Sequence, residues 1–173
     1  MTSRPLALSP SRASDYKQCP LLYRFRAIDR LPEPKTEAQV KGTLVHAVLE
    51  EMHSWPREQR TYPAAVKAIV PAWERLIEQD PEVVEPISDR QQLLIDARTL
   101  IRGYFHMENP LGFDAHEQEM YVNTVLPNGV PVRGFIDRVD IAPTGEVRVV
   151  DYKTGKKPLP RYSQAAQFQM RFY

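Results

Sequence analysis

The sequence predicts an α+β (mixed α/β) fold, with a helical N-terminal half, a central β-meander and a final helix. Apolar residues recur through much of residues 1–110 at the spacing of amphipathic helices. After Gly112 the pattern changes to the alternation of apolar and polar residues that is typical of strands. Helical spacing returns over residues 163–173. Helices, an antiparallel meander and a helix, in that order, indicate a mixed architecture.

Length and composition favour one globular domain. The 173 residues are 42% hydrophobic and 26% charged, which is ordinary for a globular protein. Residues 1–173 are therefore expected to form a single domain, with residues 1–110 as its helical part and residues 111–173 as a hairpin and a following helix. The net charge of +1 excludes an overall polycation, so an anionic partner would need a local basic patch.

The compartment is inferred from cysteine usage and from missing apolar segments. The single cysteine, Cys19, excludes an internal disulfide and is expected of a reducing compartment. No stretch approaches the roughly 18 apolar residues of a membrane span, and the N-terminus lacks the apolar segment of a signal peptide. A cytoplasmic protein without a membrane partner is expected.

Four helices are predicted before Gly112. Ser9 and Pro10 open the first helix, as a cap and a first-turn proline. It runs to about residue 28, and Pro20 divides it or kinks it because proline lacks the N–H that a helix needs. The fourth helix is expected to be capped by Ser88. The three later helices are expected over residues 37–55, 64–79 and 89–107.

Prolines and large apolar residues indicate element ends and the core. The sequence contains 16 prolines, most of which, Pro71 among them, are expected at element boundaries. The side chains expected in the core are Phe25, Leu44, Leu49, Trp73, Leu94 and Phe105.

Three strands are predicted over residues 120–126, 132–141 and 146–153. Pro143, Thr144 and Gly145 suit a three-residue hairpin loop with a left-handed last residue. This loop sets Ile141 opposite Val147 and, further from the turn, Asp137 opposite Asp151.

The predicted hairpin brings two carboxylates together. The Cβ atoms of directly opposed residues lie about 5 Å apart, where the charges of Asp137 and Asp151 repel unless a cation lies between them. Lys153 supplies one positive charge, and Mg²⁺ or Mn²⁺ would supply the rest. In the alternative interpretation no metal is bound, and Lys153 forms ion pairs with both aspartates.

The arrangement of these residues resembles the motif of the PD-(D/E)XK nucleases. Asp137 followed by Asp151-Tyr152-Lys153 is similar to that motif, and Gly134-Phe135-Ile136-Asp137-Arg138 with Val150-Asp151-Tyr152-Lys153-Thr154-Gly155 resembles its RecB-type exonuclease branch. The upstream string Gly42-Thr43-Leu44-Val45-His46 and the downstream pair Gln169 and Tyr173 are similar to two further motifs of that branch. The resemblance spans nearly the whole chain and implies a restriction-endonuclease-like core.

The resemblance implies a role for each matching residue. His46, Asp137 and Asp151 would bind Mg²⁺ or Mn²⁺, and Lys153 would orient the attacking water and stabilise charge at the phosphorus. Glu119, or its neighbour Glu117, would add an acidic ligand. Gln169 and Tyr173 would lie on a helix beside the site and contact DNA or the catalytic residues.

Two further signals concern DNA and an iron–sulfur cluster. Lys153, Lys156, Lys157 and Arg161 form a basic cluster; such clusters are usually solvated loops, but beside a nuclease hairpin this one would bind phosphates. Cys19 resembles the first cysteine of the iron–sulfur branch of these nucleases. A 4Fe–4S cluster takes four cysteines, so the sequence is expected to be a fragment that is incomplete at its C-terminus.

The resemblance supports two functions. The first is a metal-dependent DNA nuclease, in particular an exonuclease acting on DNA ends or single strands in repair or recombination, with a helicase or another repair subunit as a partner. The alternative is an inactive DNA-binding module of the same fold within a larger complex. The trio Asp137, Asp151 and Lys153 favours the nuclease, because a module that only binds has no need of it.

Overall fold

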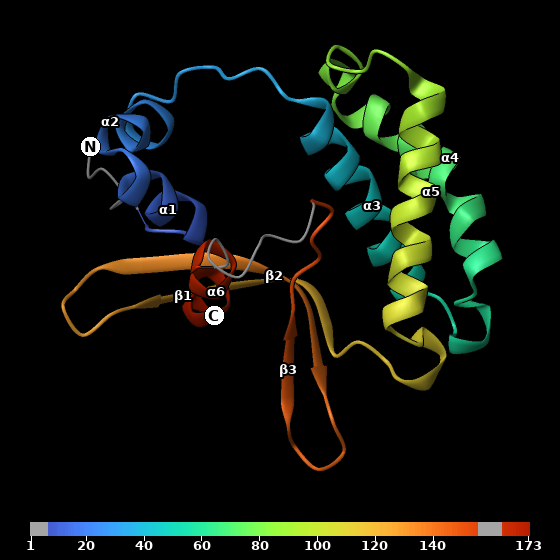
Figure 1. Cartoon of the computed structure of the whole chain (residues 1–173). Helices are drawn as coiled ribbons and strands as arrows, with labels where there is room; N and C mark the ends of the chain where they lie inside the picture. Colours follow the sequence, from blue (N-terminus) through green and yellow to red (C-terminus); the bar gives the residue numbers. More distant parts are fainter. Residues whose placement is uncertain (1–6, 156–163) are drawn as a thin grey trace.

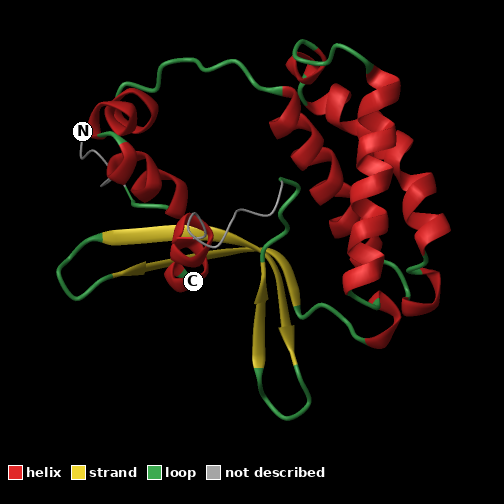
Figure 2. Cartoon of the chain, in the orientation of Figure 1, coloured by secondary structure: helices red, strands yellow, loops and turns green. Residues whose placement is uncertain are grey.

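A three-stranded antiparallel sheet connects two helical parts of the chain (Figures 1 and 2). The computed structural model describes residues 7–155 and 164–173. These residues confirm the mixed α+β fold. The α-helices are α1 (Pro10–Gln18), α2 (Pro20–Tyr23), α3 (Glu37–Ser54), α4 (Tyr62–Gln79), α5 (Arg90–Met107) and α6 (Gln164–Phe172), and the strands are β1 (Glu117–Val125), β2 (Pro131–Ile141) and β3 (Val147–Val150). None of the helices described is long and apolar enough to cross a membrane.

The first predicted helix is divided, as the position of Pro20 indicated. The side chain of Ser9 accepts a hydrogen bond from the Arg12 amide and caps α1. Cys19 is extended, and Pro20 then begins α2, which continues into a π-helical turn over Arg24–Ile28. The prediction that Phe25 lies in the core is wrong, since this side chain is 40% exposed.

Helices α3, α4 and α5 form the main hydrophobic core. Leu44, Leu49 and Trp73 are buried there, as predicted. Leu94 and Phe105 are only partly buried and pack against the core from its margin. The buried side chains of this core include Val40, Val48, Met52, Leu93 and Ile101.

Two predictions for these helices are wrong. The cap of α5 is Asp89, whose carboxylate accepts from the Gln92 amide at 3.1 Å, and not Ser88. Pro71 lies inside α4 rather than at an element boundary. Tertiary packing of an amphipathic face outweighs the local cost of an interior proline here, since the neighbouring Ala72 and Trp73 are both 1% exposed.

The hairpin between β2 and β3 has the predicted register. Ile141 pairs with Val147, and the amide of Ala142 donates to the carbonyl of Glu146 at 2.9 Å. Gly145 has a φ of +97°, in the left-handed region where glycine carries no steric penalty. Turn chemistry alone therefore fixes which residues face each other.

Strand β3 is shorter than predicted, because it ends at Val150 rather than at Lys153. The amide of Tyr152 donates to the carboxylate of Asp137 at 2.6 Å. The Asp137 side chain thus accepts the hydrogen bond that a backbone carbonyl of β2 would accept if β3 continued. The pairing of β2 with β3 ends at this point. As a result, Asp151 and Lys153 lie on an irregular segment and not on the strand.

A buried charge network joins the helices to the sheet. We use this name for Arg138, Asp140, Glu108 and Arg148. Arg138 is fully buried and pairs with both acids, through Nε to Asp140 at 3.0 Å and Nη2 to Glu108 at 2.7 Å. Arg148 forms ion pairs with the same two acids. Two cations and two anions balance each other, which a buried cluster of charges requires.

A buried histidine of α3 lies against this network. His53 is 3% exposed, and its Nε2 accepts from Nη1 of Arg138 at 3.0 Å, because a guanidinium only donates. Burial, and then the charges of Arg138 and Arg60, lower the pKa of His53 to about 4, against the opposing effect of Glu108 and Asp140. His53 is therefore neutral in the folded protein.

The free energy of unfolding is expected to fall as the pH drops below the ordinary histidine pKa of 6.5 towards about 4. Over this interval the unfolded state binds a proton at His53 that the folded state excludes, so protonation favours unfolding. The full shift corresponds to about 3 kcal/mol. Urea unfolding of the parent and of His53→Gln between about pH 7 and about pH 5 measures the effect. If the free energy of unfolding changed equally with pH in the parent and in His53→Gln, this explanation would be wrong.

Candidate metal centre

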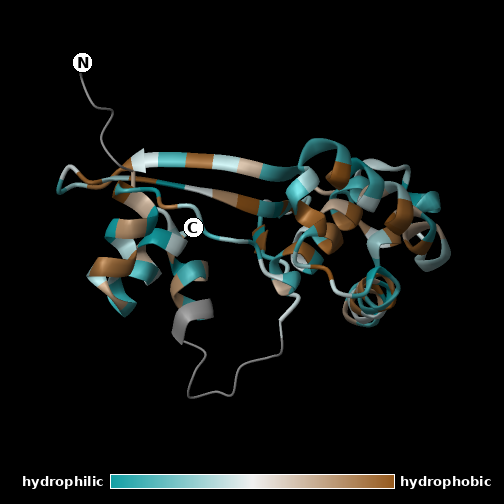
Figure 3. Cartoon of the chain, turned by 90° about the horizontal axis from the view of Figure 1, so that it is seen from above, coloured by the Kyte–Doolittle hydropathy of each residue, from teal (hydrophilic) through white to brown (hydrophobic). Residues whose placement is uncertain are grey.

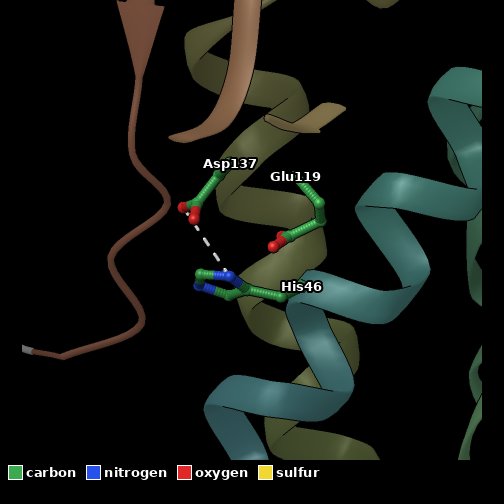
Figure 4. A group of neighbouring side chains, drawn as sticks. All are labelled: His46, Glu119 and Asp137. Carbon is green, nitrogen blue, oxygen red and sulfur yellow. Dashed lines mark ion pairs between the residues drawn. The ribbon is translucent and has the colours of Figure 1, made fainter. Parts of the chain in front are cut away.

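Three predicted site residues meet where α3 approaches β1 and β2. His46, Glu119 and Asp137 each offer a ligand atom, and these atoms lie within 4.8 Å of one another (Figure 4). His46 is on α3, Glu119 on β1 and Asp137 on β2. The imidazole and Asp137 are half-buried, and Glu119 is exposed. The group is therefore assembled from distant parts of the sequence and remains open to solvent.

Strand pairing brings the two carboxylates together. The pairs Gln118 with Arg138 and Met120 with Ile136 flank the position where Glu119 lies opposite Asp137. Glu119 itself has a φ of +46°. A non-glycine residue in this region costs on the order of 1–3 kcal/mol, and such residues cluster at functional sites.

The orientation of His46 is fixed by a backbone carbonyl. Its Nε2 lies 2.9 Å from the carbonyl oxygen of Tyr152, which only accepts, so Nε2 carries the proton. In the neutral ring the lone pair is then on Nδ1, which lies 3.6 Å from Asp137 Oδ2. A carbonyl that fixes the tautomer in this way is a common support of a metal-binding histidine.

The electrostatics of the group favour a cation. Burial raises the pKa of Asp137, and the charge of Asp151 raises it further, although the Tyr152 amide and His46 act in the opposite direction. Burial, and then the charge of Asp137, raise the pKa of Glu119. Both carboxylates are thus poorly stabilised as anions by the protein alone. Two carboxylates and one imidazole nitrogen are donors that can hold a divalent metal ion.

Asp151 and Lys153 form a second group beside the first. Lys153 Nζ lies 2.5 Å from Asp151 Oδ2 and donates to Gln169 Oε1 at 2.9 Å. The amide of Gln169 donates to Asp151 Oδ1 at 2.7 Å. Asp151 is therefore held by Lys153 and Gln169 and is not among the three clustered ligand atoms. Lys153 pairs with Asp151 but has no ion pair with Asp137 in the described part of the chain, so the alternative interpretation, in which Lys153 pairs with both aspartates, is wrong.

The C-terminal helix α6 is held against this segment by its last turn. Besides the contacts of Gln169, the hydroxyl of Tyr173 donates to the carbonyl of Phe135 at 2.7 Å. The Tyr173 ring crosses β2 at Gly134, where a Cβ would lie 2.5 Å from the ring. The predicted pair Gln169 and Tyr173 thus contacts the backbone and side chains of the site.

Gly134→Ala is expected to displace Tyr173 and with it the Gln169 contact to Asp151. A 2.5 Å approach to a ring atom cannot be accommodated in place. Because α6 supports Asp151 and Lys153, we expect the phosphodiester cleavage that the sequence resemblance implies to fall about 10- to 100-fold, with faster hydrogen exchange in α6.

The double variant Gly134→Ala/Tyr173→Ala provides the control. If both residues act through the same contact, it should lose little more activity than Tyr173→Ala alone. Fully additive losses would contradict this account.

Tyr152 supports the site, although no role was predicted for it. Its amide donates to Asp137, its carbonyl accepts from His46, and its hydroxyl accepts from Nη1 of Arg138 at 2.9 Å. A signal was present in the strand pattern: Arg138 alternates with Asp137 and so lies on the other face of β2, and an arginine that is buried there needs hydrogen-bond partners.

A cleft of about 260 Å³ is lined by residues of α3, α5 and β3 together with the Asp151–Thr154 segment. Its walls are mostly apolar, and Leu49 and Tyr104 are among them. None of the three clustered ligand residues lines it, but Asp151 and Lys153 do. The cleft therefore borders the second group and not the three clustered ligand atoms.

The remaining predicted residues do not join the site. Glu117 is exposed and lies outside the group of three clustered ligand atoms, so the geometry favours Glu119 as the acidic ligand. Cys19 is an exposed, free cysteine in the N-terminal helical part. Three basic residues of the predicted phosphate-binding cluster, Lys156, Lys157 and Arg161, lie outside the described residues.

Comparison with known proteins agrees with the geometry. The family model of the PD-(D/E)XK nuclease superfamily matches residues 7–173. A search of curated proteins finds no match. The match includes all three ligand residues, both strands that carry the carboxylates, and α6. The chain therefore belongs to the PD-(D/E)XK nuclease superfamily.

Proposed function

We propose that the chain is a Mg²⁺- or Mn²⁺-dependent deoxyribonuclease of the RecB type, an exonuclease that hydrolyses phosphodiester bonds at DNA ends or in single strands during repair or recombination. The observation that carries the proposal is the group of His46, Glu119 and Asp137, whose ligand atoms lie within 4.8 Å of one another. Lys153, on the adjoining segment, is 56% exposed and can meet an anionic substrate.

The proposed ligands are His46, Asp137 and Glu119, with Asp151 as an additional one. Asp151 is close enough for its charge to raise the pKa of Asp137. A divalent metal at this place supplies positive charge for the transition state and lowers the pKa of water. Tyr152 orients two of the ligands through its backbone.

Lys153 has the role of stabilising charge on the phosphoryl oxygens. Its ammonium donates to Gln169 and pairs with Asp151, so it is held at the edge of the site rather than free in solution. A preoriented cation needs little reorganisation during the reaction, which is the basis of electrostatic catalysis. Gln169 acts through Lys153 and Asp151 as a positioning residue.

An iron–sulfur cluster is proposed only for a longer protein. Cys19 is the single cysteine of the sequence, whereas a 4Fe–4S cluster takes four. Three cysteines would therefore have to come from elsewhere. Visible absorption and iron content of a longer chain, compared with its Cys19→Ser variant, test this role.

The function is tested with end-labelled single- and double-stranded DNA in Mg²⁺, Mn²⁺ or EDTA. The expected result is loss of label in Mg²⁺ or Mn²⁺ and none in EDTA, in successive short products if the enzyme is an exonuclease. Asp151→Ala and Lys153→Ala, purified in parallel, are expected to be inactive. Cleavage that persists in both variants would contradict the site, and binding without cleavage by the parent would favour an inactive module.

A further inference from the structure

The two strands that carry the carboxylates continue away from the metal centre with one open face. Side chains alternate along a strand, so Tyr121 and Phe135 lie on the same face as Glu119 and Asp137. Tyr121 is 48% and Phe135 57% exposed. Figure 3 shows α1 and α6 on one side of the part of the β1–β2 ribbon that extends away from α3, and none of the described elements on the other side of that part.

The opposite face of the ribbon is covered. Val132 and Ile136 are 8% and 6% exposed, and Gly134 lies under the Tyr173 ring. The exposure of Tyr121 and Phe135 is therefore a property of one face and not of the whole ribbon.

Tyr121 and Phe135 form one aromatic surface. They are direct partners in the register, and their ring centroids lie 5.1 Å apart with an interplanar angle of 49°. We call this pair the aromatic platform. Exposed aromatic faces stack on nucleobases with little sequence preference, because every base has a π face.

The aromatic platform lies two residues along the strands from the proposed metal ligands Glu119 and Asp137. Residues two apart on a strand are separated by about 6.7 Å, which is the separation expected between Asp137 and Phe135. Stacked nucleotides rise about 3.4 Å each along a strand. A strand whose phosphate lies at the metal centre would thus bring one of its next two bases over the platform.

A cation lies further along the same face. Arg133 is exposed, lies two residues beyond Phe135 on β2, and forms no ion pair within residues 7–155 and 164–173. An exposed arginine without an acidic partner beside an aromatic surface suits a backbone phosphate. Along β2, the face therefore presents first the proposed metal ligand Asp137, then the stacking surface at Phe135, and then the cation Arg133.

We infer that the open face of β1 and β2 binds unpaired nucleobases, with a base next to the scissile phosphate stacked on Tyr121 and Phe135 and a phosphate further along held by Arg133. This inference rests on the proposed nuclease function and refines its substrate to single-stranded nucleic acid at the cleavage site. A paired base within a duplex has its faces occupied by its neighbours and cannot stack in this way.

The test is binding of a single-stranded oligonucleotide containing 2-aminopurine, in EDTA so that no cleavage occurs. The parent is expected to quench the fluorescence on binding. The double variant Tyr121→Leu/Phe135→Leu keeps apolar bulk but loses the π faces, and is expected to bind about 5- to 150-fold more weakly per stacked base. Tyr16→Ala removes an aromatic that is 56% exposed on α1 and serves as the matched control, with binding expected to be unchanged.

Arg133→Gln tests the phosphate contact separately. For this variant, the slope of the logarithm of the binding constant against the logarithm of the salt concentration is expected to be smaller in magnitude by about one. Circular dichroism of each variant confirms that the fold is retained.

The outcomes separate this inference from the nuclease proposal. Equal binding and quenching by the parent and the double variant would overturn the platform, whatever the cleavage assay shows. Quenching that depends on the platform in a protein that never cleaves DNA would support the platform and overturn the nuclease. Self-association of the parent that Phe135→Leu abolishes would show that the face joins two copies of this chain, which would also overturn the inference.

Discussion

Asp137→Asn is expected to abolish metal-dependent cleavage while leaving the fold intact. Asparagine keeps an oxygen to accept from the Tyr152 amide, which lies 2.6 Å from the Asp137 carboxylate, but removes the negative charge at the centre of the ligand group. Loss of a charge-stabilising group of this kind costs at least about 10²- to 10³-fold in rate. The rate of phosphodiester hydrolysis in Mg²⁺ or Mn²⁺ is the measurement.

Calorimetric titration with Mn²⁺ provides a readout that is independent of cleavage. Asp137→Asn and Glu119→Gln should both bind Mn²⁺ more weakly than the parent. Glu117→Gln changes an exposed acid on the same strand that lies outside the ligand group and should bind normally. An Asp137→Asn protein with unchanged Mn²⁺ affinity would show that the metal lies elsewhere.

Arg138→Met is expected to cause the largest loss of stability of any single substitution considered. The guanidinium is fully buried between Asp140 and Glu108 and also donates to Tyr152. Removing one partner of a buried ion pair leaves an uncompensated charge, which costs about 3–5 kcal/mol of the free energy of unfolding. The remaining cation, Arg148, is 52% exposed and cannot replace it.

Urea unfolding measures this loss, with Arg133→Met as the control on the same strand. Arg133 is exposed, and its replacement should change the free energy of unfolding by less than about 0.5 kcal/mol. A similarly small change for Arg138→Met would mean that the buried charge network does not join the helices to the sheet.

The local parts of this structure could be predicted from the sequence because short-range chemistry determines them. The turn residues before and including Gly145 fix the register of Ile141 and Val147. Ser9 caps α1 because a serine hydroxyl can reach the free amides of a first turn. Recurrent apolar spacing predicted a helix over residues 37–55, and α3 spans Glu37–Ser54.

The features of the site that could not be predicted from the sequence depend on contacts between distant residues. The end of β3 is set by the bond from the Tyr152 amide to Asp137, and the orientation of His46 by a carbonyl 106 residues away. Neither contact can be predicted from a pattern of neighbouring residues in the sequence. The positions of the ligands could be predicted only through the family resemblance, because spacing along one strand does not show that α3 approaches it.

The support that Tyr152 gives to the site has a consequence for the newly made protein. His46 cannot meet its ligand partners until α3 has docked on the sheet, and the same docking brings His53 of α3 against the buried Arg138. An unfinished, misfolded or damaged chain therefore carries no assembled metal centre. The proposed cleavage of DNA therefore requires a folded chain, in which His46 has reached Glu119 and Asp137.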